Sequence, residues 1–227
     1  MATDQTATGQ SVFAATVTLT WPTKPAAGTK ALVVVGTPEA TITSVKDNGA
    51  VQSTFTADAA ASVGVYPWAM GVYRADGITP PASGSYAVTI TLSGTAFAVA
   101  SGRTYTGLAA GGPAAVNSNS GTGTAVTTGN VTPAVAGSLV IGGFADDSGV
   151  DPETITLTTS GATSIYTATD GTFEPGAVAQ NIVASTTATG FAWTLGDSVN
   201  WAAIAAVYSP AAAVNRGAFF ALFGDSS

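Results

Sequence analysis

Four acidic side chains lie close together in the sequence, with oxygen atoms that could form a cation site. Asp146, Asp147, Asp151 and Glu153 fall within eight positions around Gly149. Carboxylate oxygens are the ligands that Ca²⁺ prefers, but this spacing does not match the loop of an EF-hand. A solvated acidic turn is the alternative that the pattern favours. We therefore expect no bound metal and no cofactor, and keep calcium at these four residues as the lesser alternative.

The remaining chemistry is limited by composition. The chain of 227 residues contains no histidine and no cysteine, and only 8% of its residues are charged. Acid–base catalysis and nucleophile activation rely mainly on imidazole, thiolate or tuned carboxylates. Two carboxylates can serve a glycosidase, but nothing in the sequence pairs any two of the 13 acidic residues. We expect a protein that is not an enzyme.

The charge balance argues against two classes of partner. Six Lys and Arg residues are scattered singly against 13 acidic residues, which gives a net charge of -7. Because phosphate binding needs clustered cations, nucleic acid and anionic membranes are not expected partners. No apolar run is long enough to span a bilayer. Residues 1–10 lack the cationic and apolar regions of a signal peptide, so we expect synthesis in the cytoplasm without export.

Alternating hydrophobicity is the dominant structural signal. Phe13, Val17, Leu19 and Trp21 fall on one face of a strand, with threonines on the other. The Val-rich run 31–35 is typical of a strand covered on both faces. We expect 109–130 to be a loop, and helical turns at most at 59–62 and 211–214. Further strands are expected at 41–46, 51–56, 65–73, 86–92, 97–100, 104–108, 138–144, 154–158, 164–169, 177–183, 191–195 and 201–208.

The two parts of the chain resemble one another, which indicates pseudo-repeats at about 11–108 and 124–209. Residues 31–36 match 138–143, residues 86–90 match 191–195, and Tyr73 with 76–77 matches Tyr166 with 170–171. A duplicated half can give two small sandwiches or one sandwich with strands from both halves. Because no Pro-rich or charged linker separates them, we expect one all-β domain over 11–209. Its fold class is a jelly-roll-like antiparallel β-sandwich, and an internal duplication stays open.

Residues 1–10 and 210–227 lie outside this domain and are expected to form a flexible N-terminal arm and a C-terminal arm. The C-terminal arm carries four large apolar side chains, Phe219, Phe220, Leu222 and Phe223. These side chains either fold back on their own domain or dock on a neighbouring subunit. We predict that they bind a partner, and that the protein forms homo-oligomers.

Aromatic residues offer a second type of binding site. Trp68, with Tyr66 and Tyr73 nearby, can form a flat platform for a sugar, although packing in the core is the alternative that the pattern favours. Trp21, Trp193 and Trp201 lie within strand-like patterns, and we expect them in the core.

Strand and turn motifs also carry a resemblance over roughly residues 31–209. The Leu-Val-Val strand at 32–34, Ile-Thr-Ser-Val-Lys-Asp-Asn-Gly at 42–49, Ser-Gly-Ser-Tyr-Ala-Val-Thr-Ile at 83–90 and Tyr-Thr-Gly-Leu at 105–108 resemble a β-sandwich module of bacteriophage virion proteins and bacterial surface proteins. The resemblance implies display, decoration or adhesion, and no shared catalytic residues. Because no signal peptide is visible, the phage setting is favoured over the exported bacterial one.

These points together predict a structural protein of a tailed bacteriophage virion, more specifically a capsid decoration or cement protein. Its expected partners are other virion proteins, either the major capsid protein or tail proteins. The alternative is a tail-associated or surface adhesin, or a carbohydrate-binding module, that takes a host glycan at Tyr66, Trp68 and Tyr73.

Overall fold

Antiparallel β-structure accounts for all the regular secondary structure of the computed structural model, which describes residues 2–7, 9–37, 40–63, 68–146, 154–168 and 176–212. This confirms the predicted all-β fold class and the antiparallel β-sandwich. Among the described residues, no helix is long and apolar enough to cross a bilayer. The strands are β1 (Ala2–Thr6), β2 (Gln10–Thr20), β3 (Lys30–Thr37), β4 (Ile42–Asp47), β5 (Thr56–Val63), β6 (Trp68–Ala75), β7 (Ala87–Thr106), β8 (Ala115–Thr127), β9 (Ser138–Asp146), β10 (Ile155–Leu157), β11 (Thr163–Ala168), β12 (Gly176–Val183) and β13 (Ala192–Tyr208).

Each of the two sheets is built from one contiguous part of the chain. The seven-stranded sheet runs β1-β7-β3-β6-β5, with β2 and β4 also paired to β7. The six-stranded sheet runs β10-β13-β9-β12-β11, with β8 also paired to β13. We call residues 2–106 the first half and residues 115–208 the second half.

The two halves have the same connectivity. β1 and β2 follow one another along β7 and together correspond to β8, while β3 to β7 correspond in order to β9 to β13. The register also agrees, because Lys30 lies opposite Tyr105 and Leu139 lies opposite Tyr208. Both β5 and β11 contain an irregularity at the same place, at Asp58 in the first half and Ile165 in the second. Paired residues of β3, β5, β6 and β7 therefore have definable counterparts in β9, β11, β12 and β13.

This correspondence separates the sequence matches into two cases. The match between 31–36 and 138–143 and the match between 86–90 and 191–195 are each displaced by two residues, because Lys30 corresponds to Leu139, and Thr91 corresponds to Thr194 at the register shift that β7 and β13 share. Tyr73 lies on β6 and Tyr166 on β11, which are not corresponding strands.

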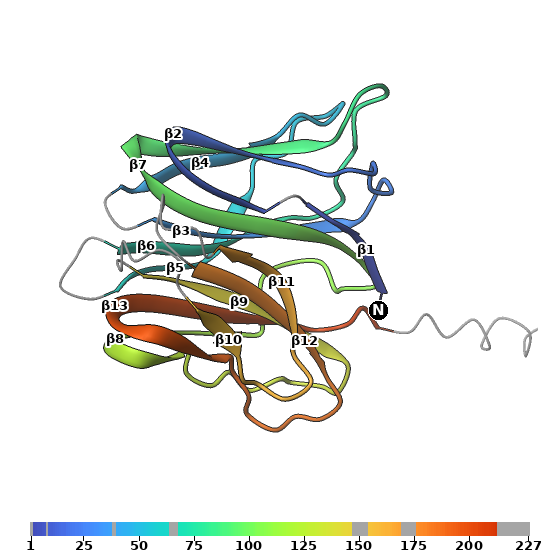
Figure 1. Ribbon diagram of the computed structural model, residues 1–227. Helices are drawn as coiled ribbons and strands as arrows, with labels where there is room; N and C mark the ends of the chain where they lie inside the picture. Colours follow the sequence, from blue (N-terminus) through green and yellow to red (C-terminus); the bar gives the residue numbers. More distant parts are fainter. Residues whose placement is uncertain are drawn as a thin grey trace, which may run out of the picture.

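Three hydrophobic clusters hold the molecule together. One cluster lies within the first half and includes Trp21 and Val33. Another lies within the second half and includes Trp193 and Trp201. The cluster between them contains residues of both halves, such as Val34. Figure 1 shows the resulting stack, with β2 and β4 at one side, β8 at the opposite side, and β3, β6 and β9 between them.

The central strands β3 and β9 are buried along their whole length. Successive side chains of β3 alternate between the inner and outer clusters, because Leu32 and Val34 face the second half while Val33 and Val35 face the core of the first. The predicted two-sided burial of the Val-rich run is confirmed, as is the core position of Trp21, Trp193 and Trp201, at 0%, 2% and 6% exposure.

Three segments differ from the sequence-based expectation in secondary structure. The expected loop at 109–130 contains β8, whose twelve paired residues lie against β13. Its Asn and Gly residues have little strand preference, so the strand is stabilised by its partner. Residues 59–62, expected as a helical turn, belong to β5, and residues 2–6, expected in a flexible arm, form β1 against the end of β7.

The predicted face of Phe13 is wrong. The ladder between β2 and β7 shifts register between Ala14 and Thr16. Because side chains alternate with a period of two, such a bulge moves the preceding residues to the opposite face. Val17 and Leu19 are buried as expected, whereas Phe13 is 51% exposed.

Candidate functional site

The acidic residues proposed as a calcium alternative are only partly described. Asp146 is the last residue of β9 and is fully buried opposite Trp201. Asp147, Asp151 and Glu153 lie outside the described residues. Within the described part of the chain, no group of three or more acidic side chains is arranged to hold a metal ion.

The structure describes only some of the predicted binding aromatics and none of the four apolar residues of the C-terminal arm. Tyr73 lies in the core cluster of the first half and is 8% exposed, so its ring is packed inside the protein. Trp68 begins β6, but its side chain and the whole of Tyr66 lie outside the described part. The apolar residues of the C-terminal arm, Phe219, Phe220, Leu222 and Phe223, lie outside it as well.

A charged cluster between the two halves is the main concentration of ionisable groups among the described residues. We use this name for Lys30, Asp58, Arg74, Asp76 and Tyr208. Lys30 begins β3, Arg74 lies near the end of β6, and Asp76 follows β6 directly. Asp58 is the extra residue at the irregularity in β5. The strand pairing therefore brings together side chains that are far apart in the sequence.

The five side chains form one continuous chain of polar contacts. Tyr208 donates its hydroxyl hydrogen to Asp58 Oδ2 at 2.7 Å. Arg74 Nε donates to Asp58 at 2.9 Å, and its Nη1 contacts Asp76. Lys30 Nζ lies 3.0 Å from Asp76 and 2.8 Å from the carbonyl oxygen of Gly111, and 5.2 Å from the centre of the Tyr208 ring. The cluster thus joins both halves to the segment that connects them.

The second half has uncharged residues at every corresponding position of this cluster. Lys30, Asp58, Arg74 and Asp76 correspond to Leu139, Ile165, Gln180 and Ile182. A polar contact between the halves is nevertheless kept, because Tyr105, the counterpart of Tyr208, donates to Gln180 Oε1 at 2.5 Å. The fold therefore tolerates an uncharged version of this site, and the charges are a specific property of the first half.

Burial and neighbouring charges shift the pKa values of two members of the charged cluster, Asp76 and Tyr208. Burial by itself raises the pKa of Asp76, but the Lys30 ammonium, the Gly111 N–H and the Arg74 guanidinium outweigh it and lower the pKa below its ordinary value. Burial raises the pKa of Tyr208, and the nearby Asp58 carboxylate raises it further. At neutral pH Asp76 is ionised and Tyr208 is protonated, so neither is poised to exchange a proton.

Two of the cavities on the described surface differ in the charge of their walls. One, of about 320 Å³, is lined by Lys30, Asp76, Tyr105 and residues of the connecting segment, Gly107, Leu108 and Ala110. The other, of about 310 Å³, is lined by uncharged residues around Gly161 and 181–189. The only charged groups in either wall are Lys30 and Asp76, which are bonded to each other. The arrangement supports a mechanical role for the cluster, namely fixing the two halves and their connection.

Burial of the tyrosine hydroxyls predicts that the protein unfolds cooperatively at alkaline pH. Burial, as the largest cause, raises the pKa of Tyr86, Tyr105 and Tyr208. Because each folded pKa lies above the unfolded value of about 10, this stabilisation is complete below about pH 10 and is lost as the pH rises further. We expect phenolate absorbance from these residues to appear only together with unfolding, as followed by circular dichroism. Gradual ionisation with an intact β-sheet spectrum would contradict this.

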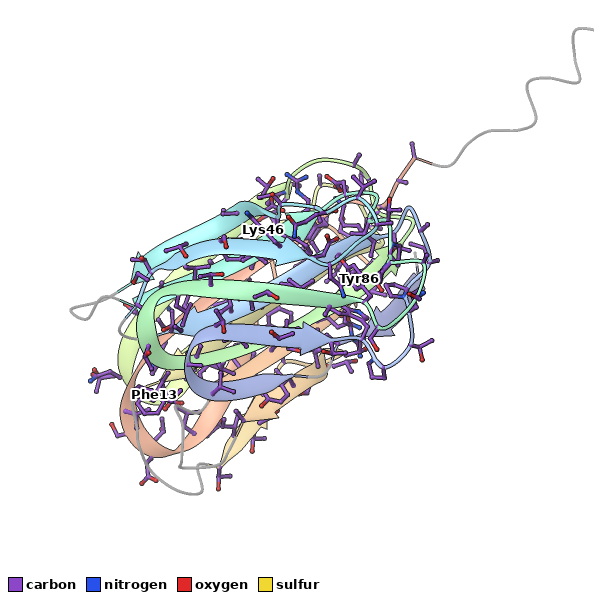
Figure 2. All side chains as sticks on the ribbon, turned by 90° about the horizontal axis from the view of Figure 1, so that it is seen from above. Phe13, Lys46 and Tyr86 are labelled. Carbon is purple, nitrogen blue, oxygen red and sulfur yellow. The ribbon has the colours of Figure 1, made fainter. Side chains whose placement is uncertain are left out.

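An aromatic pair of exposed Phe13 and partly buried Phe97 is the second feature that distinguishes the halves. Phe13 of β2 lies opposite Phe97 of β7, with ring centroids 4.7 Å apart. The corresponding pair in the second half is Thr122 and Asn200, which are joined by a hydrogen bond of 2.6 Å. Figure 2 shows Phe13 at one end of the molecule, far from Lys46 and Tyr86. The fold does not require aromatic residues at this position.

The comparisons with known proteins give no relative. No family model, no curated protein and no solved structure matches this chain.

Proposed function

We propose that this protein is a non-enzymatic structural protein of a tailed bacteriophage virion, and that it decorates the capsid by binding the major capsid protein. The observation that carries the proposal is the aromatic pair formed by Phe13, which is 51% exposed, and the partly buried Phe97. Exposed aromatic residues are typical of protein contacts, where they supply much of the binding free energy. The polar pair in the second half shows that the aromatic side chains are not needed for folding.

The rest of the described molecule supports a role in shape and contact. Three hydrophobic clusters and the charged cluster give a rigid body. The ionisable groups of the charged cluster are engaged with one another. The resemblance of the strand and turn motifs to virion sandwich modules supplies the phage setting.

Exchanging the aromatic pair for its own counterpart provides the test. Phe13→Thr combined with Phe97→Asn introduces the residues that the second half carries in the same register. We expect the free energy of unfolding to change by less than about 1 kcal/mol. Binding to capsids assembled without this protein, measured by co-sedimentation, should fall at least about tenfold, which corresponds to 1.4 kcal/mol.

Val51→Thr is the matched control, because Val51 is 70% exposed and pairs with Thr79, outside the ladder of β2 and β7 that carries the aromatic pair. Capsid binding by this variant should equal that of the wild type. If the wild-type protein binds isolated tails and not capsids, the capsid position is wrong. If it binds neither, the virion proposal itself fails.

A further inference from the structure

The strand β8 forms one edge of the six-stranded sheet. Among the described strands it pairs only with β13, and none of its 13 residues is charged. The edge strands β4 and β5 carry charges, at Lys46, Asp47 and Asp58, whereas β2 is neutral like β8 but shorter. A long neutral edge is the kind of strand to which a second strand adds most readily, and natural proteins usually protect it.

Two backbone N–H groups of β8 are occupied by the side chains of the preceding residues. Ser118 N–H donates to Asn117 Oδ1 at 2.9 Å, and Ser120 N–H donates to Asn119 Oδ1 at 3.0 Å. In an antiparallel sheet, alternate residues direct their N–H groups to opposite edges of a strand. Since these N–H groups are bonded to side chains and not to β13, they belong to the outer edge. The two asparagines cover two of the donors that an added strand would use, in the middle of the edge.

The orientation of Asn117 is fixed by a second contact. Its Nδ2 donates to the carbonyl oxygen of Asn130 at 2.9 Å. The amide therefore presents its oxygen to Ser118 and its nitrogen to Asn130, which uses both ends of the side chain. Because the bond to Asn130 already fixes the Asn117 amide, its bond to Ser118 costs less side-chain entropy than the same bond from a mobile amide would.

The first half closes the corresponding edge in a different way. The ladder along β7 is interrupted between Thr6 and Gln10, where β1 ends and β2 begins. Gly9 in this interruption lies so close to the ring of Tyr166 that an added Cβ would overlap it. Both halves thus prevent an uninterrupted open edge at the same place, one by breaking the strand and one by covering it.

We infer that the outer edge of β8 is a strand-addition surface for a second copy of this chain, and that Asn117 and Asn119 keep it closed. Two β8 strands can pair antiparallel about a twofold axis, because the edge is then complementary to itself. The absence of charge on β8 is what fits this partner. Although each chain has a net charge of -7, the paired strands would place no like charges against each other.

Opening the edge tests this inference in the full-length protein. In the variant Asn117→Thr with Asn119→Thr, the covering amides are replaced by shorter side chains with high strand preference. Sedimentation equilibrium should show self-association at least about tenfold stronger than that of the wild type. Asn130→Thr is the control, because Asn117 uses only the backbone of Asn130, and its self-association should be unchanged.

Amide hydrogen exchange gives the second measurement. At low concentration the N–H groups of Ser118 and Ser120 should exchange faster in the double variant than in the wild type, and at high concentration they should become protected. Faster exchange with no increase in self-association overturns the inference. If the double variant does not fold, Asn119→Thr alone decides by the same two measurements, since it leaves the contact between Asn117 and Asn130 intact.

Discussion

Replacing Arg74 by Gln is expected to lower the free energy of unfolding by about 3 kcal/mol, because it leaves a carboxylate buried without its cation. The Asp58 side chain is 3% exposed and the Arg74 side chain 15%. Arg74 also contacts Asp76, so two anions lose a partner. The midpoint and slope of urea unfolding measure the change, with an unchanged slope indicating that the unfolded state is unaffected.

The double variant Arg74→Gln with Asp58→Ile should recover most of this loss. It gives the first half the residues that the second half carries, Gln180 and Ile165. The glutamine introduced at position 74 can accept the hydroxyl hydrogen of Tyr208, as Gln180 accepts that of Tyr105. We expect the double variant to unfold within about 1 kcal/mol of the wild type. If the double variant instead loses the sum of what Arg74→Gln and Asp58→Ile each lose in free energy of unfolding, the ion pair and the burial of Asp58 are not coupled.

Gly142→Ala should lower the free energy of unfolding by at least about 3 kcal/mol. Gly142 lies in the buried strand β9, where an added Cβ would overlap the carbonyl oxygen of Ile204 and lie 3.0 Å from the Cα of Ala205. Both are backbone atoms, so no side-chain rotation relieves the contact. β9 would have to move away from β13, which loosens the clusters on both faces of the sheet.

Gly94→Ala is the matched control for Gly142. Gly94 lies at the register shift of β7 with β2, no heavy atom lies within 4 Å of an added Cβ, and its backbone is not in the left-handed region. We expect the free energy of unfolding to change by no more than about 0.5 kcal/mol. An equal loss in both variants would mean that a general effect of removing glycine, and not the contact with β13, causes the destabilisation. Thermal unfolding followed by circular dichroism compares the two.

Much of the fold could be predicted because alternation and continuous apolar runs report burial directly. Val17, Leu19 and Trp21 are buried as their spacing requires, and the run at 31–35 is covered on both faces. Phe13 could not be placed in the same way, because a bulge two residues later reverses the faces and nothing in the local sequence marks it. β8 was missed since its stability depends on β13, which lies more than 60 residues further along the chain for every pair.

The charged cluster was missed because its members are isolated charges at positions 30, 58, 74 and 76. Strand pairing brings them together, and that pairing is not a local property of the sequence. One signal was available. In a chain with 8% charged residues, Lys30 directly before a run of apolar residues and Arg74 at the end of another are unusual. A charge beside a buried strand needs a partner of opposite sign, which could have directed attention to these residues.

The two ends of the described chain meet at neighbouring residues. Ala2 lies opposite Thr106, and the N–H of Ala211 donates to the carbonyl oxygen of Gly107 at 2.8 Å. Phe97 lies on the same strand as Thr106, about 30 Å away at the rise of an extended chain. The molecule therefore has two different ends along the direction of β7. Residues 2 and 211 lie at one end of the molecule, and the opposite end carries the rings of Phe13 and Phe97, separated from both by the stretch of β7 between Phe97 and Thr106.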